Sequence, residues 1–241
     1  MSGPDDFFGT VSRLEGVPSA LAAARDGVDA LLRDRGLRRT TPALTAESLL
    51  RGAAASAQLA GSTSTLDEVR SGSADPIAAS AVRLYAGLLA LLPVIERSPL
   101  QALARLHTLA AAGRVPAVEL GRPRPGGDSA EVLRRLSSRL LATTTAPAIA
   151  VAGLAHAEVL TAAPFAVASD LVARALERLV LVSRGVDPTS VTVPEEGHLL
   201  LADDYTHALA GYRAGTAAGA RRWLQHVASA VTAGSSVAPI R

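Results

Sequence analysis

Apolar side chains recur along this chain at intervals of three, four and seven residues, the period of one face of an α-helix. The first such stretch runs from residue 17 to residue 37 and carries the spacing at Leu21, Val28, Leu31 and Leu32. Gly36 follows as a stop signal, because glycine favours the backbone conformation that ends helices. The pattern therefore predicts an amphipathic helix close to the N-terminus.

The same period continues almost to the C-terminus, and local signals place the helix starts. Further helices are expected over 44–59, 76–96, 99–113, 147–160, 202–213 and 217–232. Pro76, Pro99 and Pro147 open three of these, since proline fits the first helical position. Ser64 or Thr65 is expected to cap a short helix through Val69.

Two more starts depend on polar caps. Asp128 precedes a helix with Leu133, Leu136 and Leu140 on its apolar side, and Glu131 stands at capping-box spacing. Ser169 or Asp170 is expected to cap a helix that runs to Gly185.

Two segments break the helical period. Residues 113–128, GRVPAVELGRPRPGGD, are rich in Gly, Pro and Arg and predict a surface loop or small β-hairpin, with a possible extended piece over 115–120. Residues 186–197 read as a linker. The prediction is one all-α helical bundle over 44–233, a helical N-terminal extension over 1–43 and a flexible tail over 234–241.

Composition agrees with helices and excludes several classes of site. The 241 residues are 49% hydrophobic but only 3% aromatic, which favours close packing of Ala, Leu and Val. There is no cysteine, so disulfides and thiolate chemistry are excluded. All 24 basic residues are arginine, and the net charge of +2 gives no reason to expect nucleic-acid binding.

Two apolar stretches resemble membrane spans but contain charged or helix-breaking residues. Residues 77–95 include Arg83 and Pro93, and residues 146–168 include His156 and Glu158. A spanning helix needs about 20 strongly apolar residues without such groups. The start, MSGPDDFFGT, lacks the apolar region of a secretory signal. We therefore expect a cytoplasmic protein that does not enter a membrane.

Few residues in the chain suggest chemistry. The five histidines, His107, His156, His198, His207 and His226, show none of the spacings of a zinc motif, so no metal site is expected. The tandem acids at 195–196 and 203–204 are expected on a wet surface near helix starts. Arg114, Arg122 and Arg124 are expected in a solvated loop, and Trp223 in a core or interface.

The C-terminal half nevertheless carries an ordered series of familiar features. His156 lies on a helix before the stretch TAAPFAVASDLVAR at 161–174, and Tyr205, Leu209, Tyr212 and Gly215 follow in a later helix. In this order the chain resembles the Fic/Doc (Fido) family, over roughly residues 52–231. Members of that family usually transfer AMP from ATP to a protein hydroxyl. The resemblance implies an all-α Fido-like bundle.

The family motif, His-Pro-Phe-x-Asp/Glu-Gly-Asn-Gly-Arg-x-x-Arg, survives here only in part. Pro164, Phe165 and Arg174 match it. Ala163 stands at the position of the catalytic His, and Val167 at that of the metal-binding acid. The Gly-Asn-Gly and first Arg positions are held by Ala168, Ser169, Asp170 and Leu171. The resemblance thus implies a site without its base or its metal ligand, in which Pro164, Phe165, Ser169, Asp170 and Arg174 remain as a remnant anion pocket.

A second family motif is also incomplete. Many members carry an inhibitory helix, Ser/Thr-x-x-x-Glu-Gly/Asn, whose Glu pairs with the last motif Arg. Ser56 and Gly61 match that pattern, but Ala60 replaces the Glu. We expect His156 to be a satisfied buried histidine, about 10 Å from the motif loop at ~1.5 Å rise per residue. Asp170 is expected to pair with Arg174 at (i, i+4).

Three functions are consistent with these residues. The first is a catalytically degenerate Fic/Doc-like protein that acts by binding a protein partner, possibly through the 113–128 loop, or a small ligand, without a cofactor. The second is an active protein adenylyltransferase with a rearranged site, which would require ATP and Mg²⁺. The third is an unrelated helical regulator, for which salt-dependent nucleic-acid binding would be the sign. A homodimer remains open.

Overall fold

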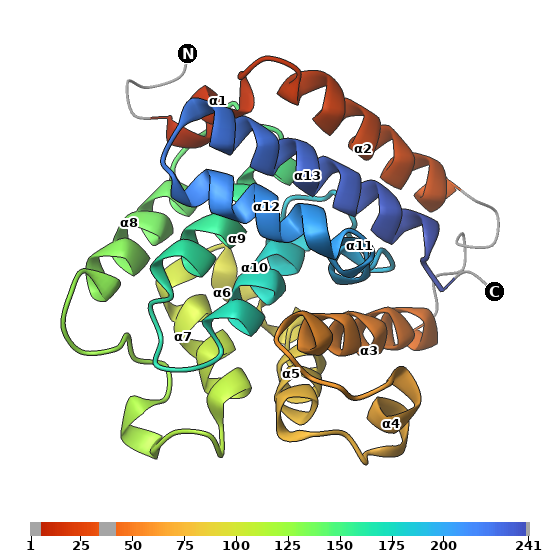
Figure 1. Cartoon of the computed structure of the whole chain (residues 1–241), viewed down its shortest axis with the longest axis vertical. Helices are drawn as coiled ribbons and strands as arrows, with labels where there is room; N and C mark the ends of the chain where they lie inside the picture. Colours follow the sequence, from red (N-terminus) through yellow and green to blue (C-terminus); the bar gives the residue numbers. More distant parts are fainter. Residues whose placement is uncertain (1–5, 34–41, 240–241) are drawn as a thin grey trace.

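The computed structural model describes residues 6–33 and 42–239, and every regular element within these ranges is a helix (Figure 1). The all-α prediction is confirmed for this part of the chain. The α-helices are α1 (Phe7–Ser12), α2 (Val17–Arg33), α3 (Pro42–Leu59), α4 (Leu66–Ser71), α5 (Pro76–Ala86), α6 (Leu92–Ile95), α7 (Pro99–Ala111), α8 (Ser129–Leu141), α9 (Ala148–Ala162), α10 (Ser169–Ser183), α11 (Pro194–Leu200), α12 (Ala202–Arg213) and α13 (Ala217–Ser236). Two 3-10 turns are η2 (Leu89–Leu91) and η3 (Ala117–Glu119). The stop signal expected at Gly36 lies outside the described residues.

Helices α9 and α10 form the centre of the molecule and pack against each other along their lengths. α9 is apolar on nearly all sides, as is typical of a helix that is buried all round. α10 is also buried, although it carries Arg174, Glu177 and Arg178. The centre of this fold is therefore a buried helix with three charged side chains packed against an apolar helix, which is where a functional site is to be sought.

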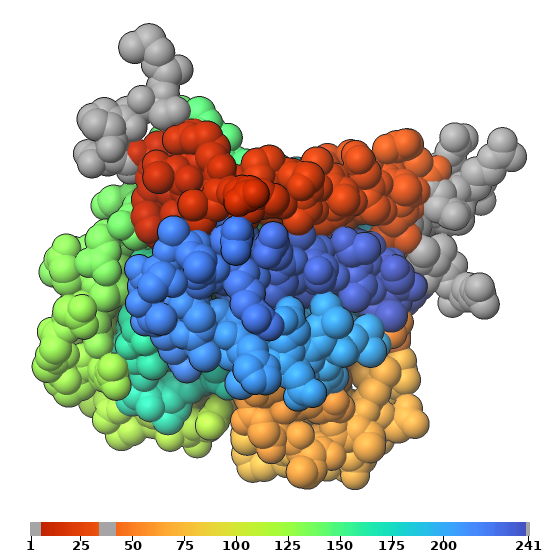
Figure 2. Space-filling view, turned by 45° about the horizontal axis from the view of Figure 1, so that its top comes forward, coloured from red at the N-terminus to blue at the C-terminus, as the bar shows by residue number. Residues whose placement is uncertain are grey.

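The N-terminal helices lie against the C-terminal helix α13. α2 runs along α13, and α1 contacts both α13 and α9. In Figure 2 these N-terminal helices (red) lie alongside the C-terminal ones (blue), and the orange segment that contains α3 to α5 lies on the other side of the blue helices. The helices expected in the N-terminal extension thus cover the C-terminal part of the bundle.

α11 packs on α13 at a distance that only glycine permits. A Cβ on Gly197 would lie 1.9 Å from the carbonyl oxygen of Ala230. Val193 N–H also donates to the carbonyl of Gly234, 3.1 Å away. These contacts hold α11, and with it His198, against the rest of the C-terminal bundle.

Several cap predictions are confirmed and others are wrong. Thr65 caps α4 in a complete capping box with Glu68. Asp128 stands at the N-cap of α8 but makes no side-chain cap bond, and Glu131 turns instead to Arg134. The cap expected at Ser169 or Asp170 is wrong, because α10 begins at Ser169 with Ala168 before it.

The long apolar helix expected over 76–96 is broken. α5 ends at Ala86 with Gly87 as its C-cap, and Pro93, which has no N–H to continue a helix, lies in the first turn of α6. No single described helix is long and apolar enough to span a membrane. α5 and the segment 89–95 reach that length only as a pair bent by 46°.

Of the two forms expected for residues 113–128, the loop is confirmed, and a 3-10 turn at Ala117–Glu119 follows Pro116 in place of the extended piece. Two boundary expectations change. The linker expected over 186–197 contains the start of α11, which Pro194 opens. The tail expected from residue 234 begins later, because α13 continues to Ser236 and buries Gly234 and Ser235.

Candidate functional site

The stretch 163–168 joins the central helices in a tight loop. Ala163 and Ala168 have φ values of 40° and 58°, in the left-handed region that non-glycine residues seldom adopt. The hydroxyl of Ser169 accepts from the backbone N–H of Phe165 at 3.0 Å and lies 3.3 Å from the carbonyl of the same residue. Ser169 therefore holds the loop closed, where a helix-capping role was expected.

The loop is fixed from outside by the segment 113–128. Phe165 stacks face to face on His107, with ring centroids 4.2 Å apart. Gly121 N–H donates to Nδ1 of His107 at 3.0 Å, and Arg124 N–H donates to the carbonyl of Pro164 at 2.8 Å. Burial lowers the pKa of His107, so the ring accepts this bond as a neutral imidazole. The segment and the motif loop thus form one connected surface.

Arg174 points into the protein, and its side chain is only 2% exposed. Its Nε donates to the hydroxyl of Ser56 at 2.8 Å, and Nη2 donates to the carbonyl of the same residue at 2.8 Å. Nη1 lies 3.4 Å from the hydroxyl of Tyr205, and Nη2 lies 3.4 Å from Asp170. The predicted pair of Asp170 with Arg174 is confirmed, and each of the three guanidinium nitrogens has a partner within the protein.

The helix that carries the incomplete inhibitory motif contributes directly to this arrangement. Ser56 is fully buried on α3 and reaches Arg174 on α10, 118 residues away in sequence. Ala60 follows the last turn of α3, and Gly61 has a φ of 92° in the turn after it. The structure therefore brings Ser56 to the motif arginine, while Ala60 offers no carboxylate there.

The two positions that the resemblance assigns to the catalytic His and the metal-binding acid carry no polar side chain. Ala163 ends α9, and Val167 packs partly buried against the core. Pro164 and Phe165 remain as scaffold: Phe165 is 3% exposed, and the Pro164 carbonyl accepts from Arg124. In this loop neither a proton-accepting side chain nor a carboxylate ligand stands where the resemblance would place one.

A buried polar column begins beside Arg174, and only part of it was expected. His156 is fully buried, as expected, and its Nε2 lies 3.0 Å from the hydroxyl of Tyr205. Its Nδ1 makes a very short contact with Oε2 of Glu177. Burial lowers the pKa of His156 to about 4, so the ring is neutral near pH 7. His156 thus joins the motif arginine to a second group of titratable side chains.

That second group extends from Glu177 to the surface. Nε2 of His198 lies 3.0 Å from Glu177 Oε2, and Nδ1 of His198 lies 2.9 Å from Nε2 of His226. Nδ1 of His226 lies 2.8 Å from Asp204, whose side chain is 44% exposed. One ring nitrogen of His156, one carboxylate oxygen of Glu177 and one ring nitrogen of His198 all lie within 4.8 Å of one another.

Sequence reasoning missed this network because its members, with His156 included, come from five helices, α9 to α13. No pair of them shows a helical spacing that would mark a motif. The only signal was indirect: a histidine and acids inside helices that are otherwise apolar.

A second buried charge pair supports α11. The guanidinium of Arg178 binds both carboxylate oxygens of Glu195, at distances down to 2.6 Å, and Tyr85 donates to the same carboxylate at 3.0 Å. Glu195 is 1% exposed, so the expectation of a wet surface is wrong for this acid. Glu196 is partly exposed and pairs with Arg51. Because the charge of Arg178 is buried, it needs the carboxylate of Glu195 buried beside it as a partner.

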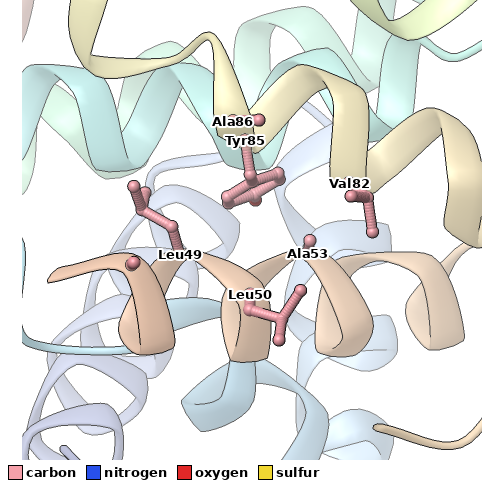
Figure 3. A pocket seen from close by; sticks show the side chains of 7 residues that line it. Leu49, Leu50, Ala53, Val82, Tyr85 and Ala86 are labelled. Carbon is pink, nitrogen blue, oxygen red and sulfur yellow. The ribbon is translucent and has the colours of Figure 1, made fainter. Parts of the chain in front are cut away.

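An apolar pocket of about 310 Å³ lies between α3 and α5, over this charge pair. Figure 3 shows Leu49 and Tyr85 in the space between the two helices, with Val82 and Ala53 beside them. Burial, together with the charge of Glu195, raises the pKa of Tyr85 well above its usual value, so the hydroxyl stays protonated.

The remaining sequence candidates lie as follows. Asp203 is exposed on the first turn of α12, as expected, and Asp204 pairs with Arg222 at 3.1 Å. Arg114 and Arg122 are exposed in their loop, as expected. Trp223 is fully buried and donates from Nε1 to the carbonyl of Gly153 at 2.7 Å, which confirms a core position.

This arrangement of helices around a central loop is found in solved structures. A Fic family protein from Desulfovibrio desulfuricans G20 superposes with a TM-score of 0.77 at 20% identity, over 90% of this chain and 72% of that one. Fic-1 from C. elegans superposes with a TM-score of 0.66 at 18% identity, over 91% of this chain and 70% of the other. A variant of the same Fic-1 fragment gives 0.67 at 17% identity, over 89% and 70%.

Comparison by sequence gives no further relative: no family model matches the chain, and no curated protein does. The structural matches nevertheless cover most of the chain. This protein has the all-α fold of Fic family proteins.

Proposed function

We propose that this Fic-fold protein acts by binding a protein partner and does not transfer AMP. The observation that carries the proposal is the state of Arg174. This is the last arginine of the remnant motif, and it is 2% exposed with its donors directed at Ser56, Tyr205 and Asp170. An arginine that contacts phosphate needs free N–H groups facing the ligand. Here every guanidinium nitrogen already has a partner within the protein, and two of these partners are Ser56 atoms at 2.8 Å.

The chemistry of the loop supports the same conclusion. A positioned general base contributes about 10²–10⁴-fold to the rate of such a transfer, and Ala163 has no proton-accepting atom. Mg²⁺ needs oxygen ligands, and Val167 supplies none. Asp170 would place a negative charge beside the phosphates of a nucleotide, which opposes their binding.

A partner-binding surface is offered by the segment 113–128 and the motif loop joined to it. Val118 is 71% exposed in this segment, between the exposed side chains of Arg114 and Arg122. The segment is held by backbone bonds from Gly121 and Arg124, so its shape is set before any partner arrives. Such preorganisation reduces the entropic cost of association.

The competing function is AMP transfer by a rearranged site, and nucleotide titration separates the two. Calorimetry with ATP up to millimolar concentration, with and without Mg²⁺, is expected to show no heat of binding. Asp170→Ala, with Asp203→Ala as an exposed control, tests whether the acid alone excludes the nucleotide; both are expected to remain silent. Metal-dependent binding by the wild-type protein that Arg174→Gln abolishes would refute the proposal.

The partner surface needs its own test. Val118→Asp is expected to abolish capture of the partner, while Leu200→Asp, at a position 60% exposed on α11, leaves it unchanged. Equal loss in both variants would mean that the segment 113–128 is not the binding surface.

A further inference from the structure

Three histidines and two acids lie end to end in the column next to Arg174. Starting from the surface, Asp204 contacts His226, His226 contacts His198, and His198 contacts Glu177. Nδ1 of His156 contacts the same carboxylate oxygen of Glu177. All but Asp204 are at most 2% exposed. The column is therefore cut off from water over most of its length.

The three hydrogen bonds between Asp204, His226, His198 and Glu177 need one hydrogen more than two neutral imidazoles provide. When Asp204 and Glu177 are both ionised, their oxygens only accept, so the ring nitrogens that face them must each act as donors. The contact between His226 and His198 needs one further hydrogen. Two neutral imidazoles hold two N–H groups in total, and the three contacts need three. Either a proton or a cation must supply the difference.

A metal ion on Nε2 of His198 supplies it without an imidazolium. The remaining N–H of His198, on Nδ1, then donates to His226, and His226 donates to Asp204.

The second oxygen of Glu177 points to the same conclusion. Among the described residues Oε1 of Glu177 is buried without a hydrogen-bond partner. A buried carboxylate oxygen left without a partner is unfavourable, and a cation is its natural partner.

We propose that His156, Glu177 and His198 bind one divalent transition-metal ion of the zinc type. The donors are Nδ1 of His156, Nε2 of His198 and the two carboxylate oxygens of Glu177, which together give four. Imidazole nitrogen and carboxylate oxygen are a donor set that zinc accepts, and four-coordination is its usual structural geometry.

The surroundings have the features of a structural metal site. The other ring nitrogens of His156 and His198 contact Tyr205 and His226, the kind of support that orients metal-binding histidines. Trp223 packs edge-on against His156, with centroids 5.3 Å apart, and shields the site from water. The ligands come from α9, α10 and α11, so a bound ion would fix three helices together. No metal site was expected because the histidines show no spacing of a known metal motif. The ligands of the proposed site come from three different helices, so they have no such spacing.

The test uses Zn²⁺ and Co²⁺ added to the full protein after treatment with a chelator. We expect one zinc per chain by elemental analysis after dialysis, a higher thermal midpoint with zinc, and the visible absorption of four-coordinate Co²⁺. His198→Gln and Glu177→Gln are expected to abolish this binding. His207→Gln is the matched control, because His207 is exposed on α12 and bonds only to a backbone carbonyl of its own helix. Asp204→Asn, which removes support for His226, is expected to weaken binding by about 10–100-fold.

Three results would overturn the proposal. The first is no bound metal at saturating Zn²⁺ and no cobalt spectrum in the wild-type protein, in which case the missing charge is a proton shared by His198 and His226. The second is metal binding that persists in His198→Gln. The third is binding that His207→Gln abolishes, which would place the ion on the surface. The wild-type cobalt spectrum decides the question even where a ligand variant fails to fold.

Discussion

Removing the carboxylate charge of Glu195 should destabilise this protein far more than removing that of the next residue. Glu195 and Arg178 are 1% and 2% exposed and lie 2.6 Å apart, so loss of one charge leaves the other buried and unpaired. Breaking a buried pair in this way costs about 3–5 kcal/mol. In Glu195→Gln the amide keeps part of the hydrogen bonding, so we expect a value near ~3 kcal/mol.

The control is Glu196→Gln. Glu196 is 24% exposed and pairs with Arg51, itself 22% exposed, so water screens the pair. We expect a loss of about 1 kcal/mol or less. The two variants differ by one position on the same helix turn and by the same chemical change. Their comparison therefore isolates burial as the cause.

The assay is urea unfolding followed by far-ultraviolet circular dichroism at pH 7, with thermal unfolding as a second readout. Glu195→Gln is expected to lower the midpoint temperature by about 6–12 °C at ~2–4 °C per kcal/mol for a chain of this size. In a double-mutant cycle Arg178→Gln combined with Glu195→Gln should cost less than the sum of the single changes, by about 0.5–3 kcal/mol. Equal losses for Glu195→Gln and Glu196→Gln would refute the reasoning.

Three further predictions concern packing, acid and the core. Gly197→Ala should lower the free energy of unfolding by about 1–3 kcal/mol or more, because its Cβ would meet the Ala230 carbonyl. Gly27→Ala, where a Cβ meets nothing, should raise the free energy of unfolding by ~0.5–1 kcal/mol in the same urea assay. The bond from Ser62 and the backbone N–H groups at the start of α5 lower the pKa of Asp75, so its contribution is present above pH ~3.9 and is lost as pH falls through the lowered value. Asp75→Asn should therefore flatten the acid limb of a stability–pH profile, and an unchanged limb would contradict this. Trp223→Phe removes the bond to Gly153 and should cost ~1–3 kcal/mol, with fluorescence lost and circular dichroism reporting the unfolding; a loss below ~0.5 kcal/mol would contradict the assigned core position.

The helices were predictable because their signals are local. The 3.6-residue period and starting residues such as Pro76, Pro99 and Thr65 act within one or two turns, and the structure confirms them. Asp128 shows the limit of such signals: the cap residue is in place, but its side chain makes no cap bond.

The polar interior was not predictable for a different reason. Glu195 was expected in water because acids near helix starts usually are, and only the tertiary position of Arg178 brings it inside. His198 and His226 are 28 residues apart and meet only because α11 packs closely on α13 through Gly197. Pair distances of this kind are set by the whole fold. The pairing of Asp170 with Arg174, four residues apart on one helix, was within reach and was predicted correctly.

The measurement that tests the central claim most directly is incubation with ATP labelled on the α-phosphate, with Mg²⁺ or Mn²⁺ and a cell extract as a source of targets. If Arg174 is held inside the protein and Ala163 and Val167 supply no base and no metal ligand, the wild-type protein transfers no more label than Arg174→Gln or no protein at all. Label that depends on the wild-type protein and disappears in Arg174→Gln would contradict the account and show a working transferase.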